Sequence, residues 1–235
     1  MSMWVDLQKR IIGGKKCEDT ERLDHVKLVD VNNNFVCGGS LISNQWILTA
    51  AHCYEQGLKA VVGVHPGPGT PEEITDHVIY RSYKIFKNDI MLLKLRNPVD
   101  LDSTGITPVR LPDCRNKPDV GDEVQRAGHA ATAPDADGKK VCGESADLQC
   151  IKAGVVDCDH NRGCWPTFFH KHTFCTEGVG VDTCPGDSGG GVLFHDMIYG
   201  VHVASGEYAC TIPMVSMDVC HYKEWIHQKT GLPFP

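Results

Sequence analysis

The twelve cysteines of this 235-residue chain decide under which conditions it can fold. Cysteines at this density are typical of proteins that form disulfides in an oxidising compartment. Zinc binding is the other common use of many cysteines, but the sequence contains no Cys-x-x-Cys pair, which weakens that interpretation. We therefore expect disulfides, although twelve cysteines permit many pairings and their spacing alone does not choose among them.

Short apolar segments separated by turn residues run through most of the chain. Residues 25–29 and 35–37 are predicted to form two strands around a turn at 32–34, and residues 46–51 and 90–95 are predicted to form buried strands. Many short strands without a helical period favour two all-β units.

Three further segments indicate how these units are joined and how the chain ends. Residues 96–123, rich in Pro, Asp and Asn, are predicted to link two halves, and residues 131–147 are predicted to form a loop. The apolar spacing within 219–229 predicts an amphipathic helix that docks on the second half. Gly231 and Pro233 are expected to end that helix.

Charge and hydropathy exclude two classes of partner. A net charge of −7 argues against nucleic-acid binding, which needs a basic surface. No apolar run approaches the roughly 20 residues that a membrane-spanning helix needs. At 41% hydrophobic residues, the chain can instead bury a sizeable core of its own.

A serine between glycines stands out in residues 183–190. Ser188 follows Gly186 and Asp187, and small neighbours allow a substrate carbonyl to approach the backbone closely. The N–H groups of Gly186 and Ser188 could then converge on a developing oxyanion. A tight structural loop held by Cys184 is the alternative interpretation of the same residues.

A nucleophilic serine needs a general base, and the base needs an orienting carboxylate. His52 follows the apolar strand predicted at 46–51, and Asp89 precedes the one predicted at 90–95. Asp89 could merely begin its strand, but its place between His52 and Ser188 favours a role beside them. These three residues are the candidate catalytic group.

The order His52, Asp89, Ser188, preceded by an Ile-Ile-Gly-Gly segment at 11–14, resembles that of the chymotrypsin-like serine proteases, and of trypsin in particular. The resemblance runs from Ile11 to Trp225. It implies that Ser188 is the nucleophile, His52 the general base and Asp89 the orienting carboxylate. It also implies an oxyanion hole formed by the N–H groups of Gly186 and Ser188.

The fold that this resemblance implies is all-β. It consists of two six-stranded antiparallel β-barrels with the active site between them and a C-terminal α-helix. The peptidase domain would then span 11–235, with the two barrels at roughly 11–110 and 120–235.

Residues 1–10 would be an activation peptide, because Lys9 and Arg10 immediately precede Ile11. In the family, cleavage at this junction, here after Arg10, frees an α-amino group that folds inward to pair with the carboxylate beside the nucleophile, here Asp187. A buried carboxylate needs such a partner charge. An expression remnant without a regulatory role is the alternative for residues 1–10.

The resemblance also selects disulfide partners. Five bonds are expected: Cys17–Cys150, Cys37–Cys53, Cys114–Cys220, Cys158–Cys175 and Cys184–Cys210. Cys142 and Cys164 are left over, and a bond between them would tie two loops beside the active site together.

In relatives, the residue six positions before the nucleophile lies at the base of the primary specificity pocket, and here that residue is Asp182. A buried carboxylate at this place favours an Arg or Lys side chain of the substrate. Thr183 and Ser205 are expected to bind the substrate as well.

The expected pocket walls depart from those of trypsin. Counting from Gly200 places residues 203–205 where relatives carry Ser-Trp-Gly, and a shift of two residues, using Ser205 and Gly206, is the alternative. Met214 stands where a pocket-lining glycine is usual, and its side chain would fill the space that a lysine or arginine needs. These departures question substrate binding and leave the catalytic group intact.

Two functional hypotheses follow. The first is a secreted serine endopeptidase, extracellular or stored in secretory granules, made as a zymogen and activated by another protease. It would act on protein or peptide substrates, be controlled by protein inhibitors, and need no cofactor or metal. The second is a protease homologue with an obstructed pocket that acts mainly by binding, or that is self-inhibited until a partner opens it.

Overall fold

The computed structural model describes residues 13–81, 88–158, 172–184 and 186–235, without the side chains of residues 131–134 and 142. Activation residues Arg10 and Ile11, together with Cys164, lie outside the described residues. No helix in the described ranges has the length and apolar character that crossing a membrane requires.

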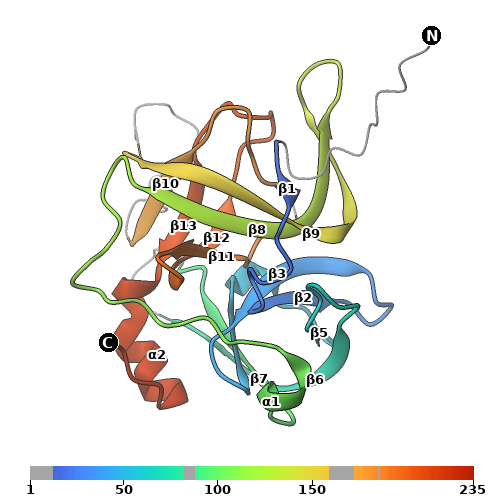
Figure 1. Cartoon of the computed structure of the whole chain (residues 1–235), viewed down its shortest axis with the longest axis vertical. Helices are drawn as coiled ribbons and strands as arrows, with labels where there is room; N and C mark the ends of the chain where they lie inside the picture. Colours follow the sequence, from blue (N-terminus) through green and yellow to red (C-terminus); the bar gives the residue numbers. More distant parts are fainter. Residues whose placement is uncertain (1–12, 82–87, 159–171, 185) are drawn as a thin grey trace.

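The first half of the chain forms a closed barrel of six antiparallel strands, in the lower part of Figure 1. In their order around the barrel, the strands are β2 (His25–Val29), β3 (Phe35–Leu41), β4 (Trp46–Thr49), β7 (Met91–Leu95), β6 (Thr70–Ile79) and β5 (Lys59–Val62). The strands predicted at 25–29 and 46–51 correspond to β2 and β4. Apart from the half-buried Trp46, their apolar side chains are buried.

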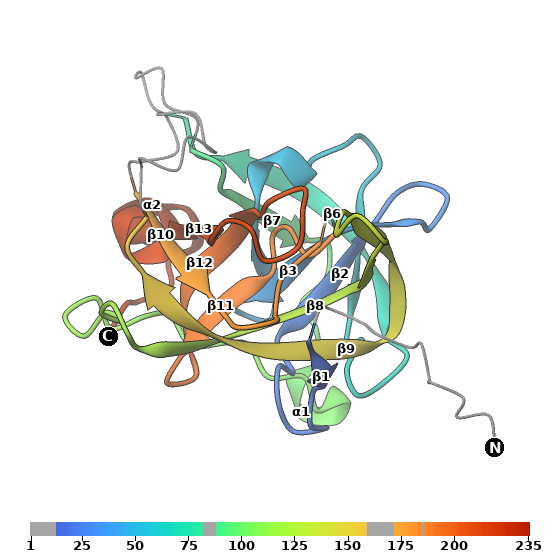
Figure 2. The same ribbon diagram turned by 90° about the horizontal axis from the view of Figure 1, so that it is seen from above.

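The second half forms a seven-stranded antiparallel sheet that closes on itself through an additional β8–β9 pairing. In sheet order, its strands are β1 (Lys15–Lys16), β9 (Lys140–Val156), β10 (Thr173–Glu177), β13 (Met214–Asp218), β12 (Met197–Ala204), β11 (Gly191–Phe194) and β8 (Glu123–Pro134). With β1 added at the edge of β9, the ring itself has six strands. The expected fold of two six-stranded antiparallel barrels is therefore confirmed, and Figure 2 shows them from above.

The segment predicted as a loop at 131–147 is instead the end of a long β-hairpin. β8 and β9 pair as far as Pro134 opposite Lys140. Asp135 organises the turn, since its Oδ1 accepts the N–H groups of Asp137 (3.0 Å) and Lys139 (2.9 Å). The prediction was wrong because the Pro, Asp and Gly residues of the turn indicated a loop, and that interpretation was extended to the flanking residues, which form strands. The hairpin extends above the rest of the second barrel in Figure 1.

Short helices complete the fold. α1 (Leu101–Thr104) lies in the segment predicted as a linker, and the Asp100 side chain caps it. The C-terminal helix is confirmed as η4 (Val219–Tyr222) followed by α2 (Lys223–Thr230), ending at Gly231 with φ 75°. A short 3₁₀ helix, η1 (Ala51–Cys53), follows β4.

The C-terminal helix connects both barrels rather than only the second. Tyr80, next to β6 of the first barrel, meets the ring of Tyr222 at 5.0 Å and the ring of Trp225 at 5.4 Å, both edge to face. Tyr222 also donates a hydrogen bond to Asn88 Oδ1 at 2.8 Å. Because Asn88 directly precedes Asp89, this hydrogen bond helps to hold the backbone beside the candidate carboxylate in place.

Four of the five expected disulfides are present. They are Cys17–Cys150, Cys37–Cys53, Cys114–Cys220 and Cys158–Cys175. The Cys184–Cys210 bond was predicted wrongly: Cys210 has a free, exposed thiol. Cys184 is disulfide-bonded, and its partner is not among the described side chains. Cys142 and Cys164 lie outside the described side chains, so the expected bond between them stays a prediction.

Alkylation in the native state tests the corrected pairing. We expect iodoacetamide to label Cys210 but not Cys184, as measured by peptide mass mapping. Labelling should be slower than for a fully solvated thiol, because burial and the nearby Asp182 carboxylate raise the pKa of Cys210 and the thiolate is the reacting form. Recovery of a peptide pair linked through Cys184 and Cys210 would contradict this assignment.

Candidate active site

Strand pairing in the first barrel brings His52 and Asp89 together. β4 and β7 are antiparallel neighbours with Thr49 opposite Met91, so the residues after β4 meet those before β7. His52 Nδ1 lies 2.6 Å from Asp89 Oδ2, and the His52 backbone N–H donates to Asp89 Oδ1 at 2.8 Å. The hydrogen bond with Asp89 is the main reason why the pKa of His52 is raised, although burial opposes it. This arrangement fixes the proton on Nδ1 and leaves Nε2 available as a base.

Ser188 lies in a loop between the two barrels. Its carbonyl accepts the N–H of Gly38 in β3 at 2.8 Å, and the Gly189 N–H donates to the carbonyl of His202 in β12 at 2.8 Å. Gly189 has φ 82°, and a Cβ there would collide with the side chain of Thr49. The glycine therefore lets the serine loop press against the segment that leads to His52.

The N–H groups expected to form the oxyanion hole belong to Gly186 and Ser188 in this loop. Within the described part of the chain, neither the Gly186 N–H nor the Ser188 N–H has an acceptor. The neighbouring N–H groups of Asp187 and Gly189 are already bonded, to the carbonyls of Cys184 and His202. Donors without an acceptor among the described residues, on a loop fixed at its other positions, are what a developing oxyanion requires.

Asp187 is fully buried beside these donors. Its Oδ1 accepts the Ala130 N–H at 3.0 Å and its Oδ2 accepts the Cys184 N–H at 2.9 Å. A Cβ on Gly128 would collide with the carboxylate, so only glycine fits there. Burial raises the pKa of Asp187 to about 7, despite these two hydrogen bonds. No cation of the described residues forms an ion pair with it, and its expected partner, Ile11, lies outside them.

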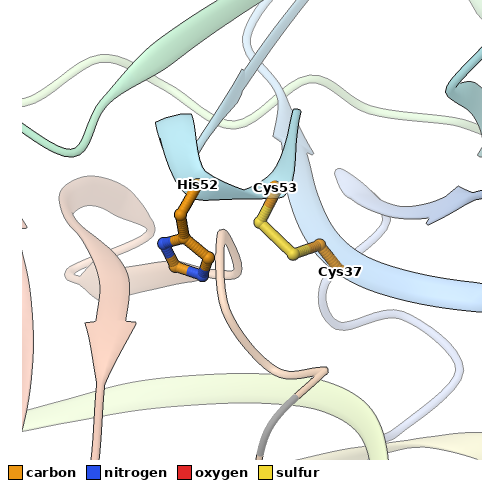
Figure 3. Close-up of side chains that lie close together, drawn as sticks. All are labelled: Cys37, His52 and Cys53. Atoms are coloured by element: carbon orange, nitrogen blue, oxygen red, sulfur yellow. A yellow bond between two sulfur atoms is a disulfide. The ribbon is translucent and has the colours of Figure 1, made fainter. Parts of the chain in front are cut away.

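No metal site is evident near the candidate base. Among the described residues, the possible ligand cluster is Cys37, His52 and Cys53, shown in Figure 3. The two sulfur atoms are joined in a disulfide and so cannot act as thiolate ligands.

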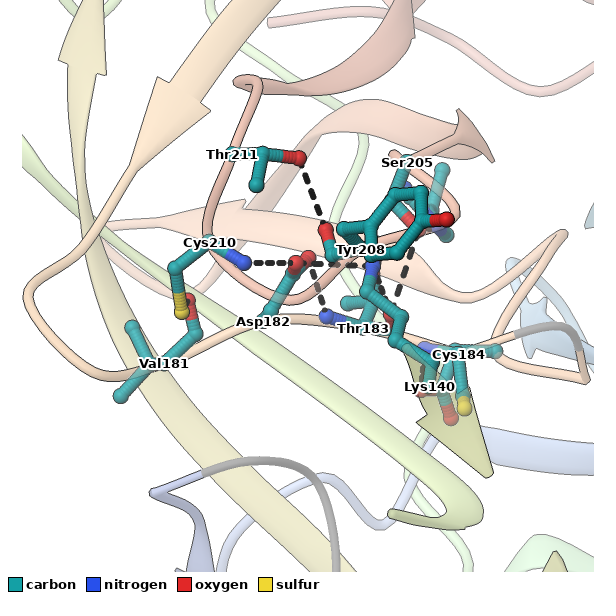
Figure 4. A network of polar contacts seen from close by, with 11 residues as sticks. Lys140, Val181, Asp182, Thr183, Cys184, Ser205, Tyr208, Cys210 and Thr211 are labelled. Carbon is teal, nitrogen blue, oxygen red and sulfur yellow. Dashed lines mark hydrogen bonds and ion pairs between the residues drawn. The ribbon is translucent and has the colours of Figure 1, made fainter. Parts of the chain in front are cut away.

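Asp182, expected at the base of the primary pocket, already has a partner. Its Oδ2 lies 2.7 Å from Lys140 Nζ, and only 2% of either side chain is exposed. The same carboxylate accepts the N–H groups of Thr183 at 2.7 Å and Cys210 at 2.8 Å. Figure 4 shows Lys140 reaching across to this carboxylate from the β8–β9 hairpin.

Comparison with known proteins now decides the family. The family model described as Trypsin matches residues 11–226. The chain belongs to the trypsin family. It is a trypsin-like serine protease of the chymotrypsin class, with the fold, the disulfides and the His-Asp pair described above.

Individual relatives agree with this assignment. The chain is 33% identical to a trypsin of Squalus acanthias, over 95% of this chain and 97% of that protein. It is 34% identical to Trypsin-4 of Rattus norvegicus, over 95% of this chain and 91% of that protein. Neuropsin, a serine protease expressed in the limbic system of mouse brain, has the same fold, with a TM-score of 0.80, 24% identity, and coverage of 93% of this chain and 99% of that one.

In this trypsin-family protein, Lys140 is the side chain that pairs with Asp182. Met214 is buried in a small apolar cluster with Ile151 and Ala153. Its side chain packs against β9, and the expectation that it takes the space needed by a substrate lysine or arginine stays a prediction. Sequence reasoning missed Lys140, because the residue is distant in the chain and lay in a predicted loop.

A cavity of about 480 Å³ adjoins Ser188, with Lys140, His202 and Ser205 in its lining. Ser205 donates to the carbonyl of Thr183 at 3.1 Å. β12 ends at Ala204, so the last two residues of the strand and Ser205 after it form part of this lining.

Beneath the cavity lies a buried Arg126–His202 pair that sequence reasoning also missed. Arg126 Nη1 donates to His202 Nδ1 at 2.9 Å, and His202 Nε2 therefore carries the proton and donates to Thr183 Oγ1 at 3.0 Å. Burial, followed by the charges of Arg126 and Lys140, lowers the pKa of His202 well below its usual value. His202 is accordingly a neutral positioning residue for Thr183.

Proposed function

We propose that the chain is a secreted serine endopeptidase, made as a zymogen and activated by cleavage after Arg10. The observation that carries this proposal is the 2.6 Å contact between His52 Nδ1 and Asp89 Oδ2, beside a serine loop that is held by hydrogen bonds to both barrels. Its substrates would be proteins or peptides, and its partners an activating protease and protein inhibitors.

The proposed chemistry follows from the placement of these groups. Ser188 Oγ attacks the scissile carbonyl carbon while His52 Nε2 takes the hydroxyl proton. The N–H groups of Gly186 and Ser188 stabilise the negative oxygen of the tetrahedral intermediate. The C–N bond then breaks, and His52 gives its proton to the leaving amine. A water molecule hydrolyses the acyl-enzyme by the same steps.

Activation would act through Asp187. Cleavage after Arg10 would free the α-amino group of Ile11, whose positive charge matches the buried carboxylate of Asp187. Because Asp187 stands between Gly186 and Ser188, fixing its side chain would fix both oxyanion donors. The Ala130 N–H and Cys184 N–H already orient that carboxylate.

We further propose a preference for peptide bonds that follow Arg or Lys. Asp182 supports this preference because its buried carboxylate already binds an ammonium group, that of Lys140. The same ion pair favours the second candidate function, a homologue with an obstructed pocket that acts by binding. Reactivity of Ser188 distinguishes the two functions.

The test is covalent labelling before and after activation. We expect a fluorophosphonate probe to label Ser188 after cleavage at Arg10, to label it far more slowly before cleavage, and to leave the Ser188→Ala variant unlabelled. Intact-mass spectrometry measures the adduct. If Ser188 stays unlabelled after complete cleavage, the chain is a binding homologue rather than an active protease.

A further inference from the structure

We propose that Lys140 is an internal occupant of the primary specificity pocket, which takes the place of a substrate's basic side chain and closes the pocket from within. The inference rests on the proposed function and deepens it. It means that Arg or Lys of a substrate must displace Lys140 before either can reach Asp182.

The contacts of the Lys140 ammonium are those of a bound ligand. Its three N–H groups meet three acceptors: Asp182 Oδ2 at 2.7 Å, the Thr183 carbonyl at 2.7 Å and Ser205 Oγ at 3.0 Å. Asp182 also accepts two backbone N–H groups, from Thr183 and Cys210. Every donor of the ammonium is used, and the carboxylate is shared among three donors, so a second cation finds no complementary site here.

Backbone pairing holds the tip of the hairpin, residues 135–140, in this position. The Lys140 N–H donates to the Glu207 carbonyl at 3.1 Å, and the Ala209 N–H donates to the Gly138 carbonyl at 3.0 Å. Lys139 opposes Tyr208 in an antiparallel bridge. The hairpin tip is therefore paired with the segment that leads into Cys210, and this pairing directs Lys140 inward.

An exposed ion pair adds little to this attachment. Lys139 Nζ lies 2.7 Å from Glu207 Oε1, with about half or more of each side chain exposed. The closed state therefore depends mainly on the backbone pairing and on the buried Lys140–Asp182 contact. Both sets of contacts involve only the hairpin tip and the residues beside it. The tip can therefore detach from Asp182 while the strands of the two barrels stay paired.

Displacement makes the affinity for basic side chains depend on how often the pocket is open. Apparent affinity falls by the fraction of molecules in the open state, so a pocket open in about one molecule in a hundred binds about a hundredfold more weakly. A protein that binds the hairpin tip in its withdrawn position would raise that fraction and so raise activity toward basic substrates.

Benzamidine, a small planar cation, probes the pocket without requiring catalysis. In the chain cleaved after Arg10, we expect Lys140→Met to bind benzamidine about 10 to 100 times more tightly than the wild type, by calorimetry. Methionine keeps much of the length of the side chain and removes the charge. The kcat/KM for arginyl amides should rise by a similar factor, whereas fluorophosphonate labelling of Ser188 should change little.

Two further variants separate the pocket from general effects. Lys152→Met removes an exposed lysine of the same strand, paired with Glu123 at 2.7 Å, and should change nothing. The double variant Lys140→Met with Asp182→Asn leaves no unpaired buried charge and should lose the gain in benzamidine affinity.

Equal benzamidine affinity in the wild type and Lys140→Met would overturn the proposal. If Lys140→Met does not fold, benzamidine affinity is compared between the wild type and Asp182→Asn. Weak binding that is the same in both supports a pocket occupied by Lys140. Strong binding to the wild type that is lost in Asp182→Asn overturns the proposal. Failure of the proposed function looks different, because Ser188 would then stay unlabelled in every variant.

Discussion

Substituting asparagine for Asp89 should lower kcat of the activated chain about ten-thousandfold. The carboxylate accepts a hydrogen bond from His52 Nδ1 at 2.6 Å, which keeps the proton on that nitrogen. The amide of asparagine can donate to Nδ1 instead, and the proton then moves to Nε2, which can no longer accept a proton from Ser188. The oxygen of the introduced amide would still accept the His52 backbone N–H, so the loop geometry should persist.

The pH profile separates this effect from a general disturbance of the site. Because Asp89 raises the pKa of His52, activity of the wild type should fall as the pH drops through a value above the ordinary histidine pKa. Without the carboxylate charge, the acid limb of the residual activity should move to lower pH.

Asp19→Asn is the matched control, since Asp19 is exposed and lies between β1 and β2, outside the segments that carry the catalytic group. It should keep full kcat and the acid limb of the wild type. A loss of less than about tenfold in Asp89→Asn, with an unchanged acid limb, would remove Asp89 from the mechanism.

The sequence made the His52–Asp89 contact predictable because both residues adjoin strongly apolar strands. β4 and β7 pair directly, so knowing the two strands places the side chains that follow and precede them. The close packing of the Ser188 loop was equally predictable, since its glycines mark where the backbone must approach a neighbouring segment. Local pattern and strand pairing agree at these positions.

Lys140 and the free Cys210 were not predictable, and both for the same physical reason. Their partners are chosen by the docking of one loop on another, and loop docking leaves no periodic signal in the sequence. Lys140 is far from Asp182 in the chain, with the rest of β9 and all of β10 between them. A lysine next to another lysine normally indicates a solvated surface, so only the hairpin register shows that Lys140 points inward.

The orientation of Met214 illustrates a finer limit of sequence reasoning. The direction of a side chain on a strand depends on which face the strand buries, and counting positions along the chain does not give that face. β13 pairs Met214 with Thr176 of β10, and the methionine packs in the cluster with Ile151 and Ala153. One-residue differences in register reverse such a direction, which counting along the chain cannot detect.

Asp187→Asn should reduce kcat/KM of the activated chain by about a few hundred- to a few thousandfold. In the proposed active form, the substitution leaves the Ile11 ammonium buried without a counter-charge, and breaking a buried ion pair costs about 3–5 kcal/mol. Each ~1.4 kcal/mol is a factor of about ten in the population of molecules with ordered oxyanion donors. The same substitution should change little in the uncleaved chain, which is the matched control.

Thermal unfolding against pH gives an independent measure of the same pair. In the uncleaved chain, burial raises the pKa of Asp187 to about 7, so the folded state holds a proton that the unfolded state has lost above about pH 4. Stability contributed by this group therefore falls as the pH rises from about 4 to 7. After cleavage, the new ammonium should stabilise the carboxylate and cancel that loss.

The difference in Tm between the cleaved and the uncleaved chain should thus grow from about pH 4 to about pH 7. It should shrink again at high pH, once the α-amino group loses its proton above its ordinary pKa of about 8. Taking the difference between two forms of one chain cancels the titration of the buried histidines, which are common to both. A Tm difference that is independent of pH, or one that survives in Asp187→Asn, would show that activation does not act through this carboxylate.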